Sequence, residues 1–220
     1  MKYLGFIITA LPAIINLSSC SNIPQDENKF NKTYKAGSIP NLNDFNTYTE
    51  IEMSMDSINR ARDFRNNRSR LFIKSYTNGK LDSNDFSRHE SLAMPCECFA
   101  GNDTLYVQMD IGFFGGEGFA IKIFDDNFQS IYFVWTDDVK PYKSNLADTA
   151  FTDSPTVMSK FQSLTIDDKP TFKAGQQLTG LLTLTSNNYY QKMYGDDIDS
   201  TYVSGKIYFI CKTKQLKKIK

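Results

Sequence analysis

The chain has 220 residues, including 17 Phe and 12 Tyr, and its 25 basic side chains balance its 25 acidic ones. A chain of this length can bury the core of one ordinary domain. The zero net charge argues against a nucleic-acid partner, and the many aromatic residues favour a fold rich in β-sheet.

The N-terminal stretch has the features of an export signal. Lys2 supplies a positive charge, and residues 4–17 are almost entirely apolar or small, which is too short a run to span a bilayer comfortably. Residues 17–20 (LSSC) then resemble the lipobox of bacterial lipoproteins. The resemblance implies that residues 1–19 are removed and that a lipid on Cys20 anchors the protein to a membrane. The alternative is an ordinary cleavage site with a cysteine nearby by chance.

Residues 20–46 are rich in Asn, Lys, Pro and Ser, so we expect a flexible tether. Asp26 and Glu27 resemble the short acidic signal of Bacteroidota-type lipoproteins. That resemblance implies an outer-membrane protein whose domain faces the cell exterior, whereas the alternative is a merely solvated linker. Residues 47–220 are predicted to form a single domain.

The first part of this domain has an ambiguous pattern. Residues 47–50 resemble a helix capping box, but the apolar residues of 51–58 fit the period of a helix and of a strand equally well. We predict one short helix or irregular segment near residues 50–68. A strand at 71–73 and a turn at Asn78-Gly79 follow.

The middle of the chain predicts an antiparallel meander. Apolar and polar residues alternate over 104–113 and again over 119–123, and 128–136 is a continuous apolar run. A glycine-rich turn at 114–118 and a second turn at 125–127 separate these strands. No helix signal follows the glycines, so a hairpin is favoured over a phosphate-binding loop.

The C-terminal part continues in the same style. We expect strands at 161–166, 178–185 and 203–212, a turn at 173–175 and a long polar loop at 187–199. Gly205 indicates a bulge or a close backbone approach.

Short strands at regular spacing, with few helical patterns, predict a mainly β fold: an antiparallel two-sheet β-sandwich. Residues 203–209 (VSGKIYF) resemble the final strand of small sandwich domains of Bacteroidota lipoproteins. That resemblance covers a handful of residues and implies no catalytic position.

Three cysteines follow Cys20. In an exported protein we expect Cys96 or Cys98 to form a disulfide with Cys211, with free buried thiols as the alternative. A metal site formed by these cysteines with His89 is disfavoured, because one intervening residue does not match the usual zinc spacing. We therefore predict no metal and no cofactor.

The sequence does not predict an enzyme. His89 is the single histidine, and no Gly-x-Ser-x-Gly elbow is present. The paired aspartates that could serve a carboxylate-based hydrolase all fall at predicted turns, where aspartate is favoured locally. They are 125–126, 137–138, 167–168 and 196–197, and a weak calcium site at Asp196, Asp197 and Asp199 is the alternative for the last pair.

Two further patterns concern the surface. Asp-Ser/Thr followed by an apolar residue or Thr resembles the O-glycosylation acceptor of the same bacteria, which implies acceptors at Ser57, Thr104, Thr149 and Ser200. Basic residues cluster at 60–70 and 212–220; they are interpreted as solvated faces, with lipid phosphates or acidic glycans as the alternative ligands.

Aromatic residues at strand ends and in loops suggest a binding role, because sugar rings stack on such faces. The candidates are Trp135, Tyr142, Tyr189 and Tyr190. The sequence thus predicts a lipid-anchored, non-catalytic binding module for a glycan or protein ligand. The alternative is a structural or assembly component of the outer membrane or periplasm, and a hydrolase is least favoured.

Overall fold

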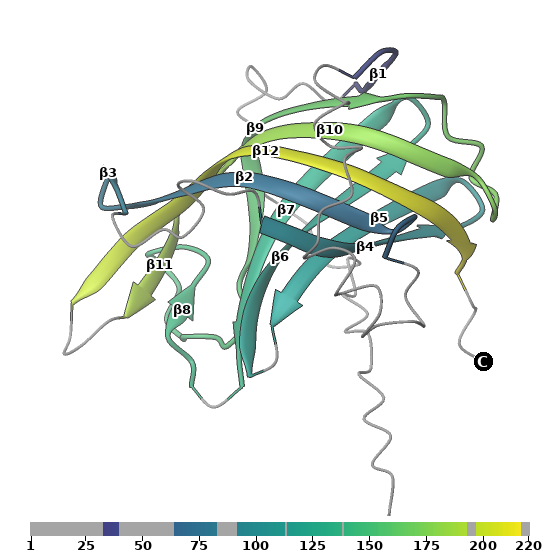
Figure 1. The fold of residues 1–220 in the computed structure, drawn as a ribbon. Helices are drawn as coiled ribbons and strands as arrows, with labels where there is room; N and C mark the ends of the chain where they lie inside the picture. The colour runs from purple at the N-terminus through teal and green to yellow at the C-terminus, as the bar shows by residue number, and fades with distance from the viewer. Residues whose placement is uncertain are drawn as a thin grey trace, which may run out of the picture.

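The fold was obtained as a computed structural model, which describes residues 33–39, 64–82, 92–112, 114–137, 139–192 and 197–216 (Figure 1). The predicted signal peptide, Cys20, the acidic pair at 26–27, Ser57 and His89 lie outside these residues, as does most of the ambiguous segment near 50–68. Residues 64–67, at the end of that segment, form a turn.

Twelve strands and no helix occur in the described part of the chain. In chain order they are β1 (Lys35–Ala36), β2 (Arg68–Thr77), β3 (Lys80–Leu81), β4 (Leu92–Ala100), β5 (Thr104–Gly112), β6 (Gly115–Phe124), β7 (Asn127–Thr136), β8 (Tyr142–Lys143), β9 (Thr156–Ile166), β10 (Gln177–Ser186), β11 (Tyr189–Lys192) and β12 (Ile198–Gln215). No helix long and apolar enough to cross a membrane was found among these residues. The prediction of a mainly β fold is confirmed.

The strands form one antiparallel sheet that closes on itself. Among the described residues, β2, β4, β5, β6, β7, β9, β10 and β12 follow one another around the closed sheet in chain order. The closing step is the pairing of β12 with β2, from Thr201↔Thr77 to Ile210↔Arg68 (Figure 1). Strand β12 is long and pairs along both of its edges, with β10 and with β2. It therefore joins the strands of the two expected sheets into one closed sheet, in which these strands have no exposed edge. This single sheet replaces the expected two-sheet sandwich.

The interior of the closed sheet is filled by every second side chain of its strands. On β5 these residues are Leu105, Val107 and Met109, and on β6 they begin at Phe119. The predicted alternation along 104–113 is therefore confirmed up to Met109, while Ile111 is exposed.

The seam between β7 and β9 is completed by other groups. These strands pair only over 131–133 and 156–158. Beyond this, the Gln162 side chain accepts a hydrogen bond from Ser130 N–H at 2.9 Å and donates one to the Phe128 carbonyl at 3.2 Å. Residues 33–37 also lie here, because β1 pairs with β9. Part of the segment expected to be a tether therefore belongs to the sheet.

The seam between β4 and β12 is closed by direct pairing. Strand β2 lies between β4 and β12 along part of their length, but it begins only at Arg68. Where β2 is absent, the C-terminal ends of β4 and β12 pair directly and in parallel, with Cys98 opposite Thr213. Asn67 joins both strands: its carbonyl accepts from Cys96 N–H at 3.0 Å, and its Oδ1 accepts from Lys212 N–H at 2.9 Å. Strand β4 was missed from sequence because Pro95 and two cysteines give no strand pattern.

The predicted turns have mixed outcomes. Asn78 and Gly79 form the expected turn, with φ values of 51° and 75°, and Asp125 has a φ of 50° in the next one. The glycine-rich turn was placed wrongly, because residues 115–118 lie inside β6. The expected polar loop at 187–199 contains a strand, β11, which pairs with β12 and β8. A close backbone approach at Gly205 is confirmed, since a Cβ there would meet the Phe72 carbonyl oxygen.

Candidate functional site

Two aromatic rings lie side by side on the outer surface of β7. Phe133 and Trp135 are two residues apart on this strand, so both point away from the interior, where Tyr132 is buried. Their ring centroids are 5.8 Å apart and the ring planes differ by 27°. The pair therefore forms an aromatic platform of two stacked rings, both of which are partly exposed.

Glycines on the neighbouring strand β6 form the floor of this platform. Gly116 is in register with Trp135, and Gly118 with Phe133. A Cβ added to Gly116 would lie 2.6 Å from Cη2 of Trp135, and one on Gly118 would lie 2.5 Å from Cζ of Phe133. Each ring thus packs closely against the backbone of a glycine, where a larger residue would not fit without a shift. The glycine run that predicted a turn serves this close packing instead.

Polar groups border the platform on strand β5. Asp110 is in register with Gly118, which is itself paired with Phe133, so the three residues form one row across the outer surface. Gln108 Nε2 donates a hydrogen bond to Asp110 Oδ2 at 2.8 Å. A carboxylate accepts several hydrogen bonds, so Asp110 keeps capacity for an external donor. We refer to Phe133, Trp135, Gln108 and Asp110 as the β5–β7 platform.

Sequence analysis identified Trp135 but missed the other three members. Their only signal is the period-two alternation, which places residues 108 and 110 opposite the apolar face of β5 and residues 133 and 135 on a common face of β7. That these faces lie on one surface follows from the pairing of β6 with both strands.

The expectation of exposed rings is wrong for Tyr142 and Tyr189, which are 6% and 5% exposed. They pack with Tyr132, with centroid distances of 6.1 Å from Tyr142 to Tyr189 and 5.8 Å from Tyr189 to Tyr132. Tyr189 points inward from β11, a strand the sequence did not reveal, whereas its neighbour Tyr190 is partly exposed. These tyrosines belong to the core.

The tyrosine cluster also holds a carboxylate. Tyr132 donates a hydrogen bond to Glu117 Oε2 at 2.8 Å. Burial raises the pKa of Tyr132 well above its usual value and also raises that of Tyr189. Both hydroxyls therefore stay protonated at neutral pH, and that of Tyr132 donates to Glu117.

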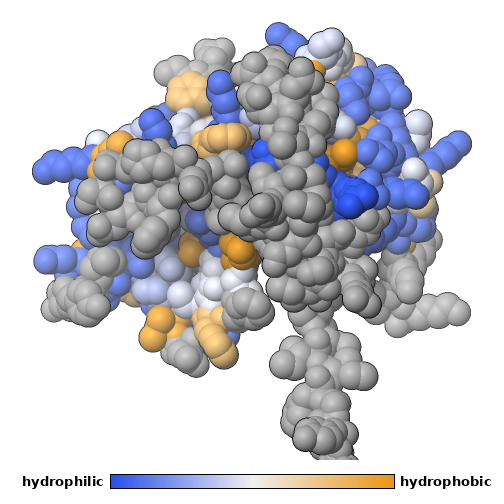
Figure 2. Space-filling model, in the orientation of Figure 1, coloured by the Kyte–Doolittle hydropathy of each residue, from blue (hydrophilic) through white to orange (hydrophobic). Residues whose placement is uncertain are grey.

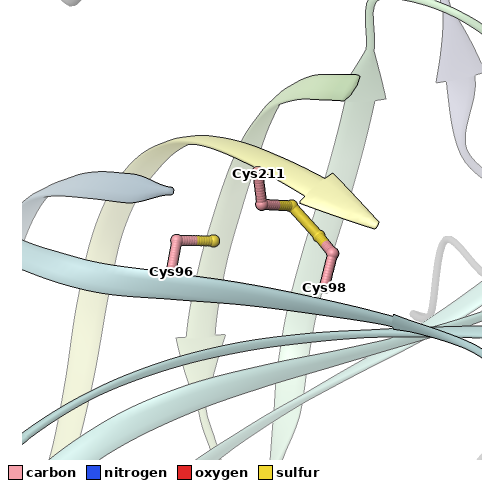
Figure 3. Close-up of side chains that lie close together, drawn as sticks. All are labelled: Cys96, Cys98 and Cys211. Carbon is pink, nitrogen blue, oxygen red and sulfur yellow. A yellow bond between two sulfur atoms is a disulfide. The ribbon is translucent and has the colours of Figure 1, made fainter. Parts of the chain in front are cut away.

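The three cysteines meet inside the closed sheet (Figure 3). Cys98 and Cys211 form a disulfide across the seam between β4 and β12, and Cys96 is a buried free thiol. The three sulfur atoms lie within 4.8 Å of one another. Burial raises the pKa of the Cys96 thiol well above its usual value, with smaller contributions from the carboxylates of Glu97 and Asp110. A neutral buried thiol of this kind is a poor nucleophile and a poor metal ligand.

The described glycosylation candidates differ in accessibility. Thr149 is exposed in the loop after β8, whereas Thr104 is partly buried at the start of β5 and donates to Asp103 Oδ1 at 3.1 Å. Ser200 is partly buried in β12, where its hydroxyl accepts from Asn188 Nδ2 at 2.9 Å. Thr149 is thus the most accessible of the three.

The aspartate pairs lie at chain reversals where they are described. Asp125 and Asp126 form the turn between β6 and β7, and the backbone N–H of Asp168 donates to Asp167 Oδ1 at 3.0 Å. At the proposed calcium position, Asp199 Oδ1 accepts a hydrogen bond from Asn78 Nδ2 at 2.6 Å, while Asp196 lies outside the described residues. Asp199 thus already serves the contact between β12 and the turn after β2.

Comparisons of the chain with protein-family models, with curated proteins and with solved structures found no match.

Proposed function

We propose that this protein is a lipid-anchored, non-catalytic module of the bacterial outer membrane that binds a neutral glycan on the β5–β7 platform. The observation that carries the proposal is the stacked pair of partly exposed rings of Phe133 and Trp135, which pack against glycine backbone beside hydrogen-bonding groups. The lipobox-like residues 17–20 support the anchor on Cys20, and the acidic pair at 26–27 supports a position on the outer face of the membrane.

The chemistry of the platform suits a sugar. The apolar C–H face of a pyranose ring can stack on an aromatic face, and its hydroxyl groups can donate to a carboxylate. Gln108 holds Asp110 at the side of the platform, so that donors on the sugar edge meet an acceptor. The Asp110 carboxylate would repel an acidic sugar, which favours a neutral one.

The platform is also rigid. Its four side chains stand on β5 and β7, which both pair with β6, and the two rings pack against Gly116 and Gly118 of β6. Little conformational entropy is lost when a ligand binds to groups that are already held in place. Two rings offer a small contact area, so we expect modest affinity for a short oligosaccharide and stronger retention by a polymer that presents many copies.

Native affinity electrophoresis tests this proposal. The protein, purified in a mild detergent, is run through gels containing soluble β-glucan, xylan, mannan or galactan. The Trp135→Ala variant removes one ring, and Phe161→Ala is the matched control because Phe161 is an exposed ring on β9. We expect at least one polysaccharide to retard the wild type and the control but not W135A. Equal retardation of W135A would refute the platform as the binding site.

A second candidate function, an assembly component of the envelope, is favoured by two exposed apolar residues, one in the turn between β5 and β6 and one just after β7. Phe114 is 86% exposed and Val139 is 58% exposed. Hydrogen bonds place them close together: Asp137 N–H donates to the Phe114 carbonyl at 3.1 Å, and Thr136 Oγ1 donates to the Val139 carbonyl at 2.7 Å. An assembly component would ignore every polysaccharide, and Phe114→Asp would reduce its apparent size in detergent extracts of the membrane.

A further inference from the structure

A second surface combines lysines with aromatic rings, on strands other than those of the platform. It lies on the outer side of β2 and β12, which run side by side in Figure 1. Its members are Phe72, Lys74, Tyr76, Tyr202, Ser204 and Lys206, which we call the β2–β12 face. The pairing register places Phe72 opposite Lys206, Lys74 opposite Ser204, and Tyr76 opposite Tyr202.

The two lysines of this face are exposed and carry no ion pair to any described residue. They are diagonal cross-strand neighbours, because Lys206 is opposite Phe72 and Lys74 is two residues further along β2. The backbone positions of diagonal neighbours lie about 7–8 Å apart, so both long side chains can reach one anion between them. A shared anion would also neutralise two like charges on the same face.

The local charge is one-sided. Asp199, at the start of β12, is the single acidic residue on strands β2, β10 and β12. Acidic residues are found instead in described turns, such as Asp125 and Asp126 or Asp167 and Asp168. The six residues of the β2–β12 face include two lysines and no acidic residue, so the face is basic.

Aromatic rings and hydroxyl groups surround the lysines. Tyr76 and Tyr202 stack with centroids 4.7 Å apart and planes 2° apart, and both are partly exposed. Phe72 is 48% exposed and its ring packs edge-on against Tyr208 at 6.0 Å. The Ser204 hydroxyl pairs with that of Thr185 on β10 at 2.8 Å. The lysines thus stand among groups that suit sugar rings and hydroxyls as well as anions.

We infer that the β2–β12 face binds an acidic polysaccharide, one that carries carboxylate or sulfate groups. The acidic groups would pair with Lys74 and Lys206, while sugar rings contact Phe72 and the Tyr76–Tyr202 pair. Figure 2 shows hydrophilic and hydrophobic residues interspersed where described residues are visible in this view. This site uses different strands from the platform, so it adds a second ligand class to the proposed function.

The test measures binding of the full detergent-purified chain to polygalacturonate, dextran sulfate and neutral dextran. The variant is Lys74→Ser with Lys206→Ser. The matched control, Lys140→Ser with Lys173→Ser, removes the same charge from exposed lysines in loops. Each exposed charge pair with the polymer contributes up to about 0.7 kcal/mol, so the loss of both pairs in K74S/K206S should lower the affinity for the acidic polymers roughly tenfold. We expect less than about a twofold loss in the control, and no retention by neutral dextran.

Further measurements make the outcome decisive. Lys74→Arg with Lys206→Arg should keep the affinity, and higher salt should weaken it. Trp135→Ala should leave acidic-polymer binding unchanged, so the two sites can fail separately. The inference is overturned if K74S/K206S binds as the wild type does or if the control loses as much affinity. It is also overturned if vesicles containing anionic phospholipid, or single-stranded DNA, bind more tightly than both acidic polymers through the same lysines.

Discussion

Removing the Cys98–Cys211 disulfide should destabilise the protein substantially. The bond joins β4 to β12 where these two strands pair directly, without β2 between them. It therefore stabilises the seam at which the sheet closes. Its two cysteines are 113 residues apart in sequence. In the chain-entropy description, a closed loop of this length removes about 16 cal/mol/K from the unfolded state, or about 4.8 kcal/mol at 25 °C.

The assay is urea unfolding of the detergent-purified protein, followed by far-ultraviolet circular dichroism. Cys98→Ala with Cys211→Ala should lower the free energy of unfolding by about 4–5 kcal/mol. Cys96→Ala is the control, because it removes a sulfur from the same cluster without removing a cross-link. It should cost only about 0.5–3 kcal/mol, as core substitutions commonly do. If the double variant loses no more than C96A, the disulfide does not hold the seam and the reasoning is refuted.

Three other outcomes are expected. A Cβ at Gly116 would meet both the Trp135 ring and the Ile111 carbonyl oxygen of β5, so Gly116→Val should displace the ring, strain the β5–β6 pairing and abolish retention on neutral polysaccharide; unchanged retention would contradict the close packing of Trp135 on Gly116. Burial raises the folded pKa of Tyr132 and Tyr189 above the unfolded value of 10.0, so their stabilising contribution is complete below pH 10 and is lost as pH rises through the folded pKa. In urea titrations at alkaline pH, the free energy of unfolding of a Tyr189→Phe variant should therefore fall less steeply with pH than that of the wild type. An identical slope would argue against this account. Cys20→Ala should move the protein from the membrane fraction to the soluble fraction, and retention of C20A in the membrane would reject lipidation. A non-permeating protease should cut the wild-type protein on intact cells, whereas cleavage only after lysis would place the domain in the periplasm.

Local patterns predicted most of the long strands but not β4, because alternation and turn residues act over a few positions. The strand at 104–112 and the turn at Asn78-Gly79 belong to this class. Closure of the sheet could not be predicted this way, since it depends on β12 pairing with β2, far away in sequence. For the same reason the sequence left open which of Cys96 and Cys98 joins Cys211. Cys98, which lies where β4 pairs directly with β12, forms the bond, and Cys96 stays a free thiol beside it.

The candidate site shows the same division. Trp135 stands out by residue type, but its partner groups Gln108 and Asp110 come from a strand two positions away in the sheet. The inward direction of Tyr189 depends on β11 pairing with β12, which no local pattern near residue 189 indicates. Residue type therefore finds a potential ligand-binding ring, whereas the strand register decides whether it is exposed.

The most direct measurement is a fluorescence titration of the wild-type protein with neutral oligosaccharides. Trp135 is the single tryptophan of the chain, so any change in tryptophan emission reports on the platform. Oligomers of β-linked glucose, xylose, mannose and galactose are added in turn to the detergent-purified protein. The proposed function predicts a saturable shift in emission with at least one of them. Emission that stays constant with every oligomer, together with unretarded migration in all four polysaccharide gels, would contradict it.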